Sequence, residues 1–457
     1  MNQFSPTHWA NQSVFYALYP LGFCGAPLRN DFSTPPIPRL EKIREWLPHI
    51  QSLGANALYL GPVFESSAHG YDTADYFHVD RRLGTDETLA ALSREIHARG
   101  MRLILDGVFN HVGRDFWAFR DVREHLANSA YVSWFAGLDF SAVSPCADPF
   151  RYEGWAGNYD LVKLNLHNPA VTQHLFDAIC SWVERFDIDG LRLDAADVLD
   201  EDFLEAIGRF GHSLKPDFWL MGEMVGGDYR HLAQPQRLDS ATNYECYKGL
   251  YSSLAEKNYF EIAYALNRQF GASGLYRGIP LYAFADNHDV NRVASNLPDP
   301  ALLFPLYCLL FTMPGVPSIY YGSEWGLKAA RTPHSDAMLR PCLDLELCQA
   351  HPEVPDLAAA IGRLAQLRRS SPALLYGDYQ PIATQHEQLA FLRESDTETV
   401  LVALNSAPQT TSMDLALPFP ARCAVDRLNG NENISVQGNG IHLELPPRWA
   451  RVIQLQK

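Results

Sequence analysis

Short apolar runs alternate along most of the chain with longer segments in which apolar residues recur at helical spacing. Eight runs predict buried parallel strands, because strands covered on both faces are continuously apolar. They cover residues 13–20, 57–63, 102–108, 190–195, 218–223, 242–245, 281–289 and 317–322. The pattern at 242–245 is the weakest of the eight.

The segments between these runs predict helices with recognisable ends. Thr85 can cap a helix that has two acidic residues in its first turn, and Gly100 can end it. Residues 301–322 are uncharged, but three prolines argue against a membrane span. We expect a buried helix followed by a buried strand there. Eight strands with intervening helices predict the α/β class and a (β/α)₈ TIM barrel.

Two segments depart from this alternation. Residues 112–166, after the third run, contain many aromatic residues and little periodicity. Long insertions of this kind are usually functional, so we expect a subdomain that walls one side of a cleft. Beyond residue 377 the pattern changes to short alternating strands such as 389–392 and 400–404, which predict an antiparallel β-sandwich. The predicted domains are therefore a barrel (1–111 and 167–376), an inserted subdomain (112–166) and a C-terminal sandwich (377–457).

The charge and composition of the chain limit the kinds of molecule that it can bind. The chain has 457 residues and a formal net charge of −16, and it has no run rich in lysine and arginine. We therefore expect no nucleic-acid partner and no membrane partner. The segment Met1–Pro6 lacks the features of a signal peptide, and the eight cysteines are scattered. These features predict a cytoplasmic protein.

Acidic residues at the ends of the predicted strands are the strongest chemical signal. Asp106, Asp194, Glu223 and Asp289 each end an apolar run or lie within two residues of its end. The active site of a (β/α)₈ barrel lies at the carboxyl ends of its strands, so these side chains should converge. A lone acid at such a position more often caps a helix. Four acids, accompanied by an arginine and two histidines, favour a site instead.

The motifs that contain these acids resemble those of the α-amylase family of glycoside hydrolases. They are Asp106–His111, Gly190–Ala195, Leu220–Glu223 and Phe284–Asp289, and the segment 315–322 matches the eighth-strand signature of that family. The resemblance implies that Asp194 is the nucleophile, Glu223 the general acid/base and Asp289 a third acid that grips sugar hydroxyls. Two displacements would retain the α configuration, with the first two carboxyl groups roughly 5–5.5 Å apart.

The same resemblance implies a set of substrate contacts. Tyr71 should stack on the reacting glucose, and Arg192 should hold Asp194 ionised and oriented. Trp155 could form a further sugar platform, although core packing is an equal alternative. The complete set of implied substrate-binding residues is Tyr71, Asp106, His111, Arg192, His288, Asp336 and Arg340.

Residues 161–165 resemble the signature of neopullulanases, cyclomaltodextrinases and maltogenic amylases, with Val162 where proline is usual. That group usually carries a domain before the barrel, for which we expect no room because the first strand begins near Ser13. Any oligomer would then use another surface. We expect that no cofactor is required. A structural calcium remains an alternative: Asn110 is present, but Val198 replaces a histidine that usually helps to bind the ion.

These observations predict a retaining hydrolase of α-1,4-glucosidic bonds in maltooligosaccharides, cyclomaltodextrins or related α-glucans. A 4-α-glucanotransferase or an isomerising enzyme of the same family would share the covalent intermediate. A catalytically silent glucan-binding protein is the alternative from another class. The retained carboxylates argue against it, and no metal-ligand cluster or phosphate-binding glycine loop competes with these interpretations.

Overall fold

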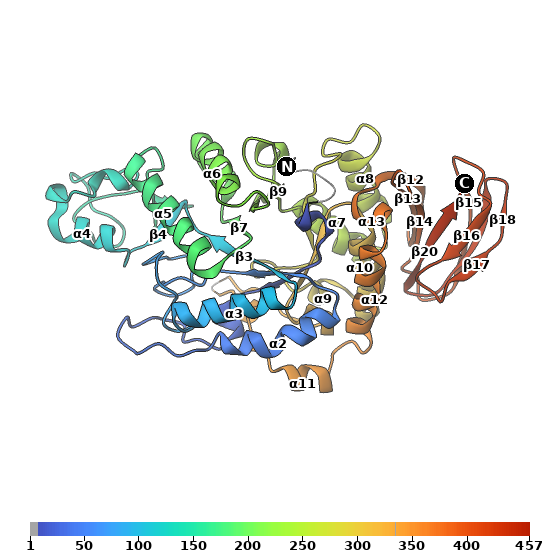
Figure 1. Cartoon of the computed structure of the whole chain (residues 1–457), viewed down its shortest axis with the longest axis horizontal. Helices are drawn as coiled ribbons and strands as arrows, with labels where there is room; N and C mark the ends of the chain where they lie inside the picture. Colours follow the sequence, from blue (N-terminus) through green and yellow to red (C-terminus); the bar gives the residue numbers. More distant parts are fainter. Residues whose placement is uncertain (1–7, 334) are drawn as a thin grey trace.

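The computed structural model describes residues 8–333 and 335–457, so the Met1–Pro6 segment lies outside the described residues. Within them, eight parallel strands form a sheet in the order β10–β11–β1–β2–β3–β7–β8–β9. A parallel bridge between Thr242 and Tyr282 joins its two edges, which closes the predicted (β/α)₈ barrel (Figure 1). The strands are β1 (Phe15–Leu18), β2 (Ala57–Leu60), β3 (Arg102–Gly107), β7 (Gly190–Leu193), β8 (Trp219–Gly222), β9 (Ser240–Ala241), β10 (Tyr282–Phe284) and β11 (Val316–Tyr320).

Helices follow the barrel strands, and several begin at the residue types expected for helix caps. Thr85 caps α3 and exchanges hydrogen bonds with Thr88, while Gly100 adopts a φ of 71° just past the end of this helix. The main helices are α2 (Glu41–Ser52), α3 (Asp86–Ala98), α5 (Pro169–Phe186), α6 (Glu201–Leu214), α7 (Tyr244–Ala255), α8 (Tyr259–Phe270), α10 (Leu303–Thr312) and α12 (Leu357–Arg369). Shorter helices are α1 (Pro20–Phe23), α9 (Val293–Asn296), α11 (Leu345–Ala350) and α13 (Pro372–Tyr376).

The sixth strand lies earlier in the chain than its sequence pattern predicts. The strand is β9, Ser240–Ala241, and helix α7 already begins at Tyr244. The prediction of a strand at 242–245 was therefore wrong by two residues. The reason is local, because the Asn243 side chain accepts a hydrogen bond from the Cys246 N–H and so caps α7.

The uncharged stretch 301–322 forms α10 and β11, as predicted. Both elements are buried, which accounts for their lack of charge. None of the helices in the described part of the chain combines the length and the apolar character needed to cross a bilayer.

The connection between β3 and α5 contains its own small antiparallel sheet. Its strands are β4 (His111–Gly113), β6 (Asn158–Lys163) and β5 (Gly154–Trp155), paired in that order. Helix α4 (Trp117–His125) accompanies them. Figure 1 shows this part at one end of the molecule, with the C-terminal strands at the opposite end.

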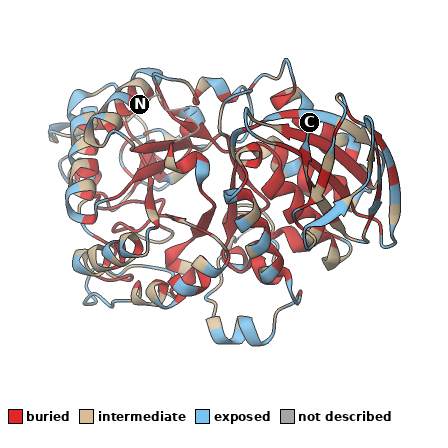
Figure 2. Cartoon of the chain, turned by 45° about the vertical axis from the view of Figure 1, so that its right-hand side comes forward, coloured by how far each residue is buried: buried red, intermediate tan, exposed pale blue. Residues whose placement is uncertain are grey.

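Two antiparallel sheets form the C-terminal part, with strand orders β12–β13–β14–β20–β16–β17 and β15–β19–β18. Alternate residues of β13 face different cores: Leu389 and Phe391 join the main core, whereas Ala390 and Leu392 pack between the two sheets. Figure 2 shows buried residues filling the strands of both parts. The strands are β12 (Asp378–Thr384), β13 (Gln388–Glu394), β14 (Thr399–Asn405), β15 (Thr411–Ala416), β16 (Cys423–Asp426), β17 (Glu432–Ile434), β18 (Val436–Gln437), β19 (Gly440–Leu445) and β20 (Trp449–Gln456).

Candidate active site

The strand-end acids lie on the carboxyl-terminal rim of the barrel. Asp106 is the penultimate residue of β3, Asp194 directly follows β7, and Glu223 directly follows β8. Asp289 departs from the expectation, because β10 ends at Phe284 and Asp289 lies five residues later, on the loop. The prediction that all four acids lie within two residues of a strand end was therefore wrong for Asp289.

One guanidinium group joins three of these acids. Arg192 Nη1 donates to both carboxylate oxygens of Asp106 at 2.9 and 3.0 Å and to Asp194 Oδ1 at 2.9 Å. Its Nη2 lies 2.8 Å from Glu223 Oε2. Arg192 and Asp194 are two residues apart on one strand and therefore point to the same side, into the barrel mouth. The arginine is 3% exposed, so these contacts are shielded from water.

The charges around Asp194 do not cancel, because one arginine faces three carboxyl groups. Burial raises the pKa of Asp194 well above its ordinary value; the Arg192 charge opposes this, and the charges of Glu223, Asp106 and Asp289 add to it. Arg192 therefore orients Asp194, as expected, but does not outweigh its burial. Carboxyl groups this close titrate as a group rather than one by one.

Asp289 has a cationic environment of its own. Arg340 Nη2 donates to Asp289 Oδ1 at 2.8 Å, and His288 Nε2 lies 3.0 Å from its Oδ2. His288 and Arg340 hold the pKa of Asp289 well below its usual range, although its side chain, which is 36% exposed, is partly desolvated. The same Arg340 nitrogen lies 3.4 Å from Asp336 Oδ2. The structure thus brings the Asp336–Arg340 pair to the site.

Aromatic rings enclose the other side of the cluster. Tyr71 donates a hydrogen bond to Asp106 Oδ2 at 3.0 Å and forms a short one with His288 Nε2. The Tyr71 and His288 rings are nearly parallel, with centroids 5.6 Å apart. Tyr19 stacks on His288 at 5.8 Å. Tyr71 is thereby fixed against the acids rather than exposed as an isolated surface ring.

His111 lies on the side of the inserted sheet. Its Nε2 is 3.8 Å from Asp194 Oδ2 and has no hydrogen-bond partner within the described residues, while its Nδ1 faces the Asn110 amide at 3.2 Å. Burial lowers the pKa of His111 to about 3, so the ring is neutral and can donate or accept a hydrogen bond. The Trp155 ring lies 5.5 Å from it and is 37% exposed.

Three further residues, which sequence reasoning missed, contact the acids. Tyr244 OH lies 3.4 Å from Glu223 Oε1 and accepts a hydrogen bond from the Asn287 amide at 3.0 Å. Tyr59 donates to Asp106 at 2.8 Å. Signals were present for two of them: Asn287 precedes His288 in the strand-end motif, and Tyr244 lies in the weak sixth run. Tyr59, inside β2, looks like an ordinary core residue.

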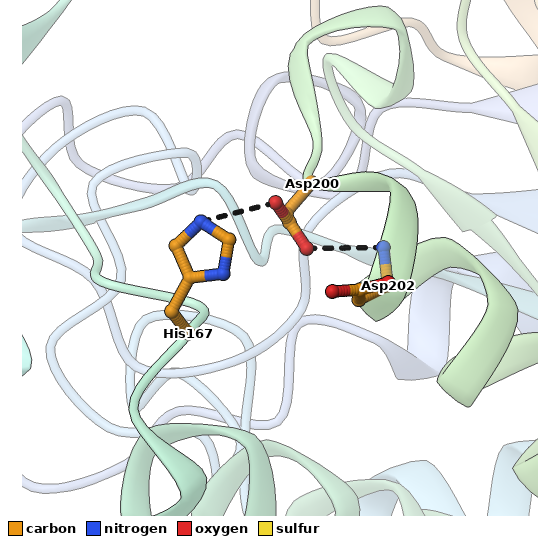
Figure 3. Close-up of side chains that lie close together, drawn as sticks. All are labelled: His167, Asp200 and Asp202. Carbon is orange, nitrogen blue, oxygen red and sulfur yellow. Dashed lines mark hydrogen bonds and ion pairs between the residues drawn. The ribbon is translucent and has the colours of Figure 1, made fainter.

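Away from these acids, a possible metal-binding group of three side chains occurs in the described residues, at His167, Asp200 and Asp202 (Figure 3). His167 Nε2 lies 3.1 Å from Asp200 Oδ2, and the other Asp200 oxygen accepts the Asp202 N–H as the cap of α6. His167 and Asp202 are exposed. Helix capping with an ion pair explains the group.

Clustered carboxyl groups at the carboxyl-terminal rim of a (β/α)₈ barrel are typical of glycoside hydrolases. Residues 36–344 match the family model described as alpha amylase, catalytic domain, and residues 381–452 match the one described as maltogenic amylase, C-terminal domain. The chain therefore belongs to the alpha-amylase family and is a glycoside hydrolase.

Similar proteins agree with this assignment. A cyclomaltodextrinase from Bacillus sp. is 30% identical over 88% of this chain and 74% of its own length. Neopullulanase 2 from Thermoactinomyces vulgaris is 31% identical over 98% of this chain and 79% of its own. Among solved structures, the cyclic α-maltosyl-(1→6)-maltose hydrolase of Arthrobacter globiformis has a TM-score of 0.81 and 28% identity, covering 98% of this chain and 99% of that one.

Proposed function

We propose that this enzyme hydrolyses α-1,4-glucosidic bonds in cyclic and linear maltooligosaccharides with retention of configuration. The observation that carries the proposal is the single Arg192 guanidinium in contact with Asp106, Asp194 and Glu223. It fixes two carboxyl groups from neighbouring strands in one water-excluded cluster. A double displacement needs two such groups, one on each side of the scissile bond.

In the first step, Asp194 attacks the anomeric carbon while Glu223 gives its proton to the departing glycosidic oxygen. The C–O bond of the substrate breaks and an ester to Asp194 forms. In the second step, Glu223 takes a proton from water, whose oxygen attacks the same carbon and releases Asp194. Arg192 and the Ala195 N–H, which donates to Glu223 Oε2 at 3.1 Å, would hold the two carboxyl groups in place.

The remaining site residues are proposed to bind the sugar. Asp289, which Arg340 and His288 keep ionised, would accept hydroxyl hydrogen bonds that tighten in the oxocarbenium-like transition state. The free Nε2 of His111 suits a further hydroxyl group. Tyr71 would cover the apolar face of the same ring, and Asp336 the next sugar outward.

The substrates follow from the named relatives, which are a cyclomaltodextrinase, a neopullulanase and a hydrolase of a cyclic maltosyl-maltose. The test is a time course on β-cyclomaltodextrin, maltohexaose and cyclic α-maltosyl-(1→6)-maltose, with the anomer of each new end read by proton NMR. We expect α-anomeric maltose and glucose from at least one ring. Release of the β-anomer would refute the double displacement.

The rival outcome is transfer to a sugar hydroxyl instead of water. Pure maltotriose separates the two: hydrolysis gives only shorter products, whereas a glucanotransferase accumulates longer ones. A variant with Asp194→Asn that still cleaved any of these substrates would remove Asp194 from its role. Binding of maltohexaose without cleavage by the wild type would instead identify a silent glucan-binding protein.

We also propose a reducing, cytoplasmic location. All eight cysteines lie in the described part of the chain and carry free thiols, which is usual for proteins kept in reducing surroundings. Cell fractionation tests this location. Calcium remains a separate prediction, which rests on the presence of Asn110, and calorimetric titration with calcium after treatment with a chelator would decide it.

A further inference from the structure

A cavity that is partly open to solvent lies on the face of the barrel opposite the acids. It has a volume of about 140 Å³ and is lined by residues that precede β10 and β11 and by the start of the C-terminal sheet. Arg277, Gly315, Asp378, Tyr379 and Arg393 are among the lining residues. We call it the basal cavity. Because it lies at the amino-terminal ends of the strands, it shares no residue with the candidate active site.

The charge at the basal cavity is unbalanced. Arg393, which lines it, is 1% exposed and donates to the carbonyls of Thr312 at 2.6 Å and Gly377 at 2.9 Å. Arg368, just behind, is fully buried and donates to the carbonyls of Phe311, Met313 and Gly315. The two guanidinium groups lie close enough to repel each other. No carboxylate of the described residues forms an ion pair with either.

The partners of these arginines do not neutralise them. Several are carbonyls at the carboxyl-terminal end of α10, where a helix dipole supplies about half a negative charge. When both guanidinium groups are charged, the excess positive charge is more than one. Burial lowers the pKa of Arg368 to about 9 and that of Arg393 well below its ordinary value, so an anion beside them would favour their charged forms. Asp378 at the rim is already paired with Arg277 at 3.0 Å, so that pair contributes no net charge.

An unused donor lies at the same place. The Tyr379 side chain is 3% exposed, and its hydroxyl has no hydrogen-bond partner among the described residues. A buried hydroxyl without a partner costs about 1–3 kcal/mol, so such groups usually have a ligand or an ordered water. Arg393 has five N–H hydrogens, and three of them, one each on Nε, Nη1 and Nη2, are donated to backbone carbonyls. Nη1 and Nη2 each keep a second hydrogen.

We propose that the basal cavity binds one small inorganic oxyanion, of the phosphate or sulfate kind, between Arg393 and the Tyr379 hydroxyl. The guanidinium fork matches a tetrahedral oxyanion, and the volume suits a small polyatomic ion. Arg393 on β13 already donates to the Thr312 carbonyl at the end of α10, so an anion bound to its guanidinium would strengthen this link between the barrel and strands β12 and β13 of the C-terminal sheet. It therefore acts on stability rather than on the chemistry at the opposite rim.

The test titrates inorganic phosphate into the full-length protein at constant ionic strength, balanced with sodium gluconate, a much larger anion. Calorimetry should give one site per chain. At a phosphate concentration 100-fold above Kd, Tm should rise by about 2–3 °C, since the linkage contribution is about RT ln 100 and unfolding entropy scales with chain length. The KM for maltohexaose should not change, because the site is remote from the cleft.

Two variants keep the proposal refutable. Tyr379→Phe should fold with a Tm in gluconate that is equal to or above that of the wild type, because it removes a buried hydroxyl without a partner, and should bind phosphate about 3- to 10-fold more weakly, because it loses one hydrogen bond. Arg393→Lys should bind more weakly still, since it keeps the charge but loses the fork. Tyr264→Phe, an exposed tyrosine on α8, is the matched control and should bind as the wild type does.

Three results would overturn the proposal. One is the absence of a saturable response to phosphate in the wild type. Another is an affinity for phosphate that Tyr379→Phe leaves unchanged. Competition between phosphate and maltohexaose would also count against the proposal, because it would place the ion in the cleft. The third is a response to chloride as large as the response to phosphate, which would mean that the site does not select an oxyanion.

Discussion

Replacing Asp194 by asparagine should separate activity from stability. The change keeps the shape of the side chain and removes one negative charge from a cluster in which Arg192 faces three carboxyl groups. Without the nucleophile we expect kcat to fall by about 10⁴-fold or more. The cluster itself should become more stable, because the like charges of Glu223 and Asp106 oppose the ionised form of Asp194.

The expected change in the free energy of unfolding can be estimated from the contacts of Asp194. Exchanging the charged Arg192–Asp194 hydrogen bond for a neutral one costs about 1–1.5 kcal/mol. Two carboxylates about 5 Å apart repel by about 3 kcal/mol at an effective dielectric constant of about 20. Removing the repulsion from both neighbours, about 6 kcal/mol in all, leaves a net gain of about 4–5 kcal/mol. With an unfolding entropy of about 2.1 cal/mol/K per residue, or about 1 kcal/mol/K for the whole chain, Tm should rise by about 4–5 °C.

The dependence on pH provides the decisive check. The pKa of Asp194 is raised in the folded state, so its favourable contribution is complete below the unfolded value of about 3.9 and is lost as pH rises through the folded value. Asparagine does not titrate. The Tm advantage of the variant should therefore vanish near pH 4 and grow as pH rises.

Differential scanning calorimetry from pH 4 to 8, with rates on maltohexaose, measures both effects. Asp414→Asn, at a carboxyl group that is 89% exposed on β15, is the control and should change neither Tm nor rate. A variant with Asp194→Asn that lost stability at pH 7, or whose Tm difference did not depend on pH, would refute the reasoning about the cluster.

Three further predictions follow from the site. The acidic limb of kcat/KM should lie above the ordinary aspartate pKa of about 3.9, because burial raises the pKa of Asp194; a limb at or below that value in a pH–rate profile would contradict this. Tyr244→Phe should lower kcat about 2- to 10-fold, with an unchanged circular dichroism spectrum, since it removes one hydrogen bond to Glu223; wild-type kcat would exclude that contact during turnover. Trp155→Ala should raise KM for maltohexaose several-fold with Tm nearly unchanged if its ring is a sugar platform, whereas a large drop in Tm with normal KM would assign it to core packing.

The local pattern of the sequence was sufficient for most of the barrel. Continuous apolar runs marked strands that are covered on both faces, and Thr85 marked the start of α3, because these signals depend only on neighbouring residues. The prediction misplaced the sixth strand because it, too, depended only on the local pattern. Its two residues, Ser240 and Ala241, carry little pattern, and the Asn243 cap could equally have followed a loop.

The sequence by itself also determined which acids would gather, because residues at the carboxyl ends of barrel strands must share one rim. It could not determine how their charges balance. Only the tertiary structure decides that Arg192 contacts three carboxyl groups and that Asp289 binds Arg340 instead. It also decides that Tyr244 contacts Glu223. These contacts join residues from different strands and loops. Their distances and burial, which set pKa and energy, exist only once the barrel closes.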